Sequence, residues 1–154
     1  MSDKRTMQVE AIANGTVIDH IPGPATLIVA ELIAERDDKV FIGMNMPSKK
    51  IGRKGVVKIA DRELTPEKIS RLALLAPGAS MCIIRDYKVV EKRPIPIPKA
   101  FTGIATCPNG NCITNHEACR TRFAVLTADP LTLRCDFCER SFPASELSVR
   151  QVLG

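Results

Sequence analysis

The chain has 154 residues, of which 45% are hydrophobic and 25% charged, and its formal net charge is +5. These values describe a globular protein, and an aromatic content of 4% without Trp removes the usual stacking surfaces for single-stranded nucleic acid. No apolar run approaches the roughly 20 residues that cross a bilayer, and no signal-peptide-like stretch follows Met1, so we expect a cytoplasmic protein.

The first predicted elements are two neighbouring strands and a helix. Gln8–Ile12 alternates between polar and apolar residues, Asn14–Gly15 is typical of a turn, and Thr16–Ile21 predicts a second strand beside the first. Pro24 opens a helix, which ends at the charged loop Glu35–Lys39. The apolar residues of this helix are Leu27, Ile28, Leu32 and Ile33.

Three further strands and a second helix follow. The strands are predicted at Lys39–Met46, Val56–Ile59 and Ala79–Val90. Between the last two, Thr65 is a good N-cap and Pro66 a good first residue for a helix that stops at Pro77–Gly78. This order predicts an α+β domain with a ferredoxin-like antiparallel sheet and two helices on one face. The other face of the sheet stays free for a ligand or an interface.

Alternating prolines indicate a boundary between two domains. Between Arg93 and Lys99 they are Pro94, Pro96 and Pro98. They exclude a helix or a central strand and keep the chain extended. Ile95 and Ile97 either pack between the domains or belong to an ordinary spacer. We therefore divide the chain into residues 1–98 and 99–154.

The C-terminal domain is predicted to be small, all-β and built around a metal. Strands are expected at Ile104–Thr106 and in a hairpin of Arg122–Leu126 with Leu131–Arg134. Four cysteines form two close pairs separated by 22 residues: Cys107 with Cys112, and Cys135 with Cys138. This spacing is typical of a zinc-ribbon-like site, and reducing conditions in the cytoplasm favour metal ligands over disulfides.

Four thiolates would complete the coordination of one Zn²⁺ per chain. Such a site has no open position for water or substrate, so we expect the metal to fold the domain and not to catalyse a reaction. His116 and Cys119 lie near the first pair and could replace a ligand, but neither belongs to a close pair, and we predict that both are loop residues. Cys82 is remote and is predicted to lie in the core or in a pocket wall.

The positive charge is concentrated in the N-terminal domain. Residues 1–98 hold 16 Lys/Arg against 12 Asp/Glu, whereas residues 99–154 hold 6 against 5. Because four thiolates with one zinc ion would add a charge of about −2, the metal domain is not basic, as a DNA-reading domain would be.

Two groups of polar residues in the N-terminal domain are candidate ligand contacts. Asp19 and His20 follow an apolar run, but a catalytic role would require an organised nucleophile, which they lack, so an ordinary surface pair is the favoured interpretation. Lys58 and Lys92 lie on or beside strands, where a rigid backbone could aim both ammonium groups at a polyphosphate. A solvated basic face is the alternative, because no glycine-rich phosphate loop accompanies the lysines.

Several motifs together closely resemble the regulatory chain of aspartate carbamoyltransferase. They are Gln8–Ile12, Gly15–Pro22, Gly52–Lys54, Leu72–Leu74 with Ala76–Pro77, and Cys107-Pro-Asn-Gly-Asn-Cys112. The resemblance spans almost the whole chain. It implies a noncatalytic subunit whose N-terminal domain binds nucleotides and pairs with a second copy, while its zinc domain contacts the catalytic chain.

The resemblance also implies an assembly, its effectors and their contacts. Three dimers of such a subunit bridge two catalytic trimers; CTP, reinforced by UTP, inhibits pyrimidine biosynthesis, and ATP opposes this effect. The base pocket would be lined by Val9, Ala11, Ile12, Ile84, Tyr87 and Val89. Asp19 and Lys58 would hold the ribose, and His20 and Lys92 the phosphates. The zinc ligands would be Cys107, Cys112, Cys135 and Cys138.

Two departures from the family pattern concern these contacts. Relatives carry an Asn where this chain has Cys82, so a side-chain amide contact to the ligand is lost and effector preference is open. The segment Asn115–Arg120 also differs, near the expected contact with the catalytic chain.

Two other functions fit parts of the sequence. A zinc-ribbon nucleic-acid-binding protein would account for the cysteine spacing and for an isoelectric point near 9.0. A metalloenzyme would require His116 or Glu117 to replace a thiolate and open a coordination position.

Overall fold

A computed structural model of the chain describes residues 11–149. In this part, five strands form one antiparallel sheet in the order β2-β3-β1-β4-β5. The strands are β1 (Gly15–Pro22), β2 (Val40–Ser48), β3 (Gly52–Ala60), β4 (Ser80–Arg85) and β5 (Lys88–Pro94). The helices are α1 (Thr26–Ile33), which follows the 3₁₀ turn η1 (Gly23–Ala25), and α2 (Pro66–Leu75). The first four strands and the two helices follow the ferredoxin-like βαββαβ order, which confirms the predicted fold class.

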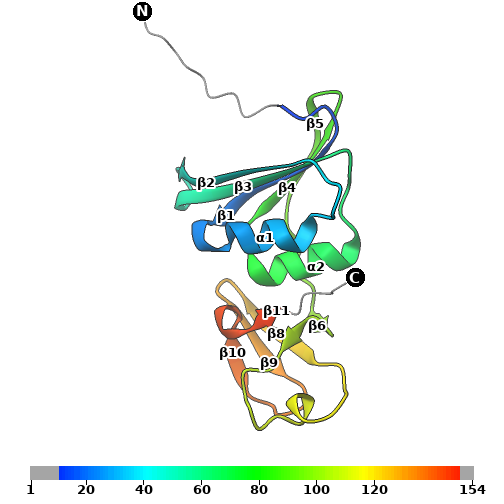
Figure 1. The fold of residues 1–154 in the computed structure, drawn as a ribbon. Coiled ribbons are helices and arrows are strands. Elements are labelled where there is room, and N and C mark those ends of the chain that lie inside the picture. Colours follow the sequence, from blue (N-terminus) through cyan, green and yellow to red (C-terminus); the bar gives the residue numbers. More distant parts are fainter. Residues whose placement is uncertain (1–10, 150–154) are drawn as a thin grey trace, which may run out of the picture.

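Both helices cover the same face of the sheet (Figure 1). Alternate residues of β1 and β3 point toward them, among them the fully buried Ile18, Val57 and Ile59. Thr65 caps α2 as predicted, since its Oγ1 accepts a hydrogen bond from the Lys68 N–H at 3.3 Å. The opposite face of the sheet carries no helix among the described residues, and we call it the free face.

The prediction of a single strand over Ala79–Val90 is wrong in one respect, because this segment forms a hairpin of two strands. Strands β4 and β5 are joined at Asp86 and Tyr87, which have φ values of 49° and 64°. Two successive residues in the left-handed region are typical of a type I′ turn, which usually contains Gly or Asn. The turn lacks that glycine, and the alternating apolar residues on either side of it read as one continuous strand.

Two other elements differ from expectation near the N-terminus. Ala11 and Ile12, at the end of the predicted first strand, lie outside any strand, and Gln8 and Val9 fall outside the described residues. Helix α1 begins at Thr26, two residues after Pro24, and it buries Val29 and Ile33 while Leu27 and Ile28 are about half exposed.

The C-terminal part is all-β apart from short 3₁₀ turns, as predicted. A four-stranded antiparallel sheet has the order β10-β9-β8-β6, and β7 pairs with β11. The strands are β6 (Ala100–Thr102), β7 (Ala105–Thr106), β8 (Arg122–Ala128), β9 (Leu131–Cys135), β10 (Ser141–Pro143) and β11 (Ser148–Val149). The 3₁₀ turns are η2 (Ile113–Asn115) and η3 (Ala144–Glu146).

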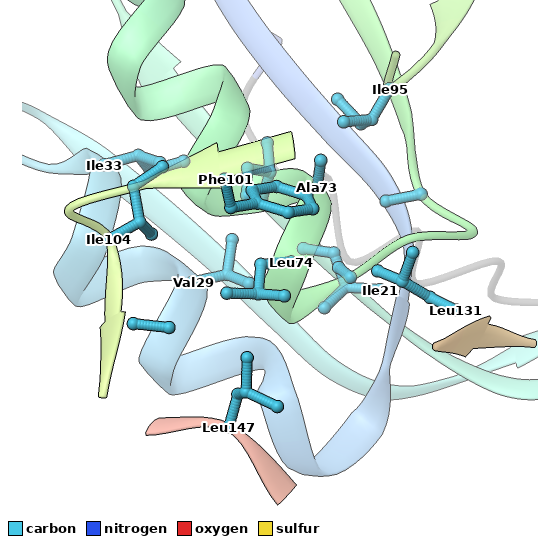
Figure 2. Packing of buried hydrophobic residues seen from close by; sticks show 14 of the residues in the cluster. Ile21, Val29, Ile33, Ala73, Leu74, Ile95, Phe101, Ile104, Leu131 and Leu147 are labelled. Atoms are coloured by element: carbon cyan, nitrogen blue, oxygen red, sulfur yellow. The ribbon is translucent and has the colours of Figure 1, made fainter. Parts of the chain in front are cut away.

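A single apolar core runs from the N-terminal sheet into the C-terminal part. Figure 2 shows Phe101, just after the proline-rich segment, packed beside Ala73 of α2, and Ile104, Leu74 and Leu147 belong to the same cluster of buried residues. Ile95 is buried in the same core and Ile97 packs against it, so the proline-rich segment is a packed connection. In the described part of the chain, neither helix has the length and apolar character that spanning a membrane requires.

Candidate ligand pocket and metal centre

The four paired cysteines meet at one point of the C-terminal part. The sulfur atoms of Cys107, Cys112, Cys135 and Cys138 all lie within 4.8 Å of one another. Cys107 Sγ is 3.7 Å from Cys138 Sγ, and Cys112 Sγ is 3.8 Å from Cys135 Sγ. A tetrahedron with zinc–sulfur bonds of about 2.3 Å has sulfur–sulfur edges of about 3.8 Å. The donor set and its dimensions therefore fit a tetrahedral metal site.

The protein groups around these sulfurs differ from one cysteine to the next. Burial raises the pKa of Cys107 and of Cys135. Burial also acts on Cys138, but hydrogen bonds from the Arg140 N–H and the Asn109 side chain outweigh it and lower the pKa of Cys138 to about 7. A metal ion that binds here must therefore displace protons from buried thiols.

Side chains next to the first cysteine pair hold the loop in place. Asn115 Nδ2 donates to the carbonyl oxygens of Cys107 and Asn109 at 3.0 and 2.8 Å. His116 Nε2 lies 2.8 Å from the Gly110 carbonyl oxygen and is not part of the sulfur cluster. Cys119 also lies outside the cluster, as expected for a loop residue.

A pocket of about 360 Å³ opens on the free face of the N-terminal sheet. This volume lies within the range of sites for small ligands. Its walls are mostly apolar, and Asp19 and Lys58 are the charged groups in them. The lining residues are Val17, Asp19, Phe41, Gly43, Met46, Val56, Lys58, Cys82, Ile84 and Val89.

A β-bulge interrupts β1 at Asp19, which lines this pocket, and at the following residue, His20. The pairing with β3 joins Ile18 to Val57 and then Ile21 to Gly55, so Asp19 and His20 interrupt the ladder. His20 has a φ of 59°, a left-handed conformation that costs on the order of 1–3 kcal/mol for a residue with a side chain. Bulges of this kind redirect side chains and are common next to functional sites.

Asp19 connects the bulge to a lysine on the neighbouring strand. Its carboxylate accepts hydrogen bonds from Lys54 Nζ, at 2.9 Å to Oδ1, and from the His20 N–H at 2.6 Å. Burial opposes ionisation of Asp19, but these donors outweigh it and lower the pKa of its carboxyl group. On the other side, the His20 ring Nδ1 lies 3.0 Å from Ser80 Oγ.

The structure brings some of the predicted nucleotide contacts together and leaves others apart. Four of them line the pocket: Asp19, Lys58, Ile84 and Val89. Ile12 packs with Cys82 and Ile84 at its edge, and Lys92 pairs with Cys82 across β4 and β5, so both leave the sheet on the same face. Ala11 is exposed, Tyr87 is 69% exposed at the hairpin turn, and Val9 lies outside the described residues.

Sequence reasoning missed two polar residues of this site, Lys54 and Ser80. In the sequence, Lys54 is one of several basic residues between Lys49 and Lys58, and only the sheet register brings it to Asp19. Ser80 gave no signal, because a lone serine at the start of a strand has no distinguishing pattern.

Comparison with known proteins gives a consistent match over both parts of the chain. Residues 7–96 match the family model of the aspartate carbamoyltransferase regulatory chain, allosteric domain, and residues 99–148 match that of its metal binding domain. The regulatory chain of Thermococcus gammatolerans is 46% identical over 144 residues, which cover 92% of this chain and 95% of the relative. That of Porphyromonas gingivalis is 45% identical over 148 residues, covering 95% and 98%.

Proposed function

The chain belongs to the aspartate carbamoyltransferase regulatory chain family, and we propose that it binds CTP, UTP and ATP and transmits their effects to catalytic trimers in pyrimidine biosynthesis. It is a noncatalytic subunit, and its partner is the catalytic chain. We assign nucleotide binding and self-association to residues 1–98, the hold on the catalytic chain to residues 99–154, and the assembly to the cytoplasm.

The nucleotide proposal rests on the division of the pocket region into an apolar wall and an end with basic side chains. Val17, Ile84 and Val89 form an apolar wall suited to a nucleobase. Lys58 lies in the pocket, and Lys54 and His20 lie beside Asp19 where β1 bulges. A nucleotide with its base on the apolar wall, its ribose near Asp19 and Lys58, and its phosphates toward His20 and Lys92 satisfies both regions.

The metal of the C-terminal domain is proposed to be zinc. Four thiolates with tetrahedral dimensions are the ligand set that structural zinc prefers. When bound, zinc would supply cross-links between the two cysteine loops and no open coordination position. Ile113 and Phe137, next to ligands in the two loops, are 49% and 46% exposed, and they are suitable apolar contacts for the catalytic chain.

Self-association is proposed to use the edge strand β2. The two edges of the sheet differ, because β5 carries Lys88, Glu91, Lys92 and Arg93, whereas β2 has no charged residue. Charges protect an edge strand from pairing with another chain, and β2 lacks them, although it has a bulge between Gly43 and Met46 and a proline, Pro47. A second copy can pair antiparallel along β2 about a twofold axis, with Ile42 and Met44 in the contact.

Competing nucleotides can have opposite effects through one pocket. Each ligand shifts the assembly toward the quaternary state that it binds more tightly, and the coupling is typically about 1–3 kcal/mol. Because this coupling is reciprocal, substrates on the catalytic chain must change nucleotide affinity here by the same factor.

The direct test is to mix this chain with its cognate catalytic subunit and record aspartate saturation curves with and without CTP, UTP and ATP. We expect the regulatory chain to make the curves sensitive to these nucleotides. Curves that are identical with and without every nucleotide, in a complex shown by size-exclusion chromatography to be assembled, would overturn the proposal.

The role of Lys92 in phosphate binding is tested by Lys92→Ala. We expect weaker CTP binding in isothermal titration calorimetry, because a cation on the pocket side of the sheet is lost, and unchanged assembly with the catalytic chain. Lys88→Ala removes a charge from the same strand and serves as the control. Unchanged CTP affinity in Lys92→Ala would remove this residue from the site.

The proposed dimer is tested by Ile42→Lys. A charge in the middle of β2 is expected to convert the dimer to monomer in sedimentation velocity experiments. Val90→Lys places the same charge on β5 and is expected to leave the dimer intact. Dissociation by Val90→Lys alone would move the interface to the other edge.

A further inference from the structure

Ser80 has a buried hydroxyl group for which the proposed function so far gives no role. It is the first residue of β4, is 8% exposed, and lies opposite Asp19 in the pairing of β4 with β1. Its Oγ lies 3.0 Å from Nδ1 of the His20 ring. The hydroxyl therefore contacts a side chain that we place at the phosphate end of the pocket.

The β1 bulge makes this contact possible. Regular alternation would turn His20 away from Asp19, toward the helices. The left-handed backbone at His20 and the shifted register instead bring both residues to the free face, where Ser80 lies. Ile21 resumes the buried face immediately afterwards, so the redirection is confined to two residues.

We propose that Ser80 is a positioning residue that orients the His20 imidazole for the phosphates of the bound nucleotide. With Nδ1 engaged by Ser80, Nε2 is the ring nitrogen left for the ligand. A neutral ring that accepts the Ser80 O–H at Nδ1 carries its proton on Nε2, which can donate to a phosphoryl oxygen. A protonated ring donates Nδ1–H to Ser80 Oγ and also keeps Nε2–H for the ligand.

The backbone of His20 is held by the ion pair of Asp19 and Lys54. The His20 N–H donates to Asp19, and Asp19 is itself paired with Lys54. The backbone and the ring of His20 are thus fixed by different partners, and Ser80 is the one that acts on the ring. This inference rests on the proposed nucleotide site. It identifies Ser80 as a residue that affects ligand binding through the ring of His20.

The test compares Ser80→Ala with Ser80→Thr, which keeps the hydroxyl, and with Ser70→Ala in α2 as a remote control. We expect Ser80→Ala to weaken CTP binding by roughly three- to tenfold in calorimetry, the effect of one lost hydrogen bond. Ser80→Thr should retain most of the affinity, and Ser70→Ala all of it. Binding of cytidine, measured by competition, should not change, because it has no phosphate.

A double-mutant cycle and nuclear magnetic resonance separate positioning from a general structural effect. In a His20→Gln background, Ser80→Ala should cause no further loss of CTP affinity. The chain has 2 histidines, so the ring ¹⁵N signals of His20 are easily resolved from those of His116, and they should shift toward a mixture of tautomers in Ser80→Ala.

Two results would overturn the inference. One is an equal loss of CTP affinity with and without His20, which would make Ser80 a structural residue. The other is unchanged affinity together with unchanged ring signals. Failure of the wild-type chain to bind any nucleotide would instead refute the proposed function, while the ring signals would still show whether Ser80 orients His20.

Discussion

At the scale of single residues, the metal centre shows how the protein accommodates buried thiolates. The Asn109 N–H donates to Cys107, and the Cys138 N–H donates to Cys135. Cys112 lies 3.1 Å from the buried hydroxyl of Thr114, and both residues are almost inaccessible to solvent. A metal-bound thiolate can only accept, so this hydroxyl must donate to it.

We predict that Thr114→Val speeds loss of the metal. Valine has nearly the same shape but no donor, so the buried thiolate of Cys112 loses a hydrogen bond, and zinc affinity should fall by about 10-fold or more. Zinc release to a coloured chelator measures the rate. Thr114→Ser keeps the hydroxyl and should release zinc at nearly the wild-type rate; equal rates in all three proteins would contradict the role of the hydroxyl.

At the scale of elements, helix α2 carries the packing between the sheet and the metal domain. Leu72 and Ala73 are fully buried, and Leu74 is 3% exposed in the same core as Phe101 of β6. Figure 2 shows this side of α2 facing residues of the C-terminal part. Truncation here removes contacts on both sides of the domain boundary.

We therefore expect Leu74→Ala to destabilise the zinc-loaded chain by about 2–5 kcal/mol, as large-to-small changes in cores do. Leu27→Ala in α1 is the matched control, since Leu27 is 51% exposed and its loss should matter little. Urea denaturation followed by circular dichroism gives both values. A similar small effect of the two changes would show that α2 is not part of a packed interface.

The elements that the sequence predicted well are those with local signals. Thr65 and Pro66 mark the start of α2, and the cysteine spacing marks the metal loops, because each signal acts within a few residues. The β4–β5 turn was missed because Asp86 and Tyr87 adopt left-handed conformations without a glycine. The contact of Ser80 with His20 depends on strand register and on a bulge, which join residues 60 positions apart. Such pairings exist only after the sheet has formed.

At the scale of the whole molecule, the two parts share one hydrophobic core. Ile18 of the sheet, Leu72 of α2 and Phe123 of β8 belong to the same cluster of buried residues, which extends to the metal-binding cysteines. The packing is thus continuous between the segments that match the two family models, residues 7–96 and 99–148. The core couples the stability of the metal domain to that of the helices.

Metal removal should accordingly have two effects. We expect a chelator or a mercurial to release the catalytic chain, seen by size-exclusion chromatography, because the cysteine loops lose their cross-link. Nucleotide binding should largely survive, but the thermal midpoint of the N-terminal domain should fall as α2 loses its cover. An assembly that stays intact after complete metal loss would show that zinc is not needed for the contact.

Helices α1 and α2 lie between the sheet and the metal domain (Figure 1), with the pocket on the far side of the sheet. Under the proposed function, the nucleotide and the catalytic chain would therefore bind at opposite ends of one chain. The two would then not compete for space, and we expect a ternary complex to form in either order. Helices α1 and α2, which pack against both the sheet and the C-terminal part, are the structural connection between these two ends.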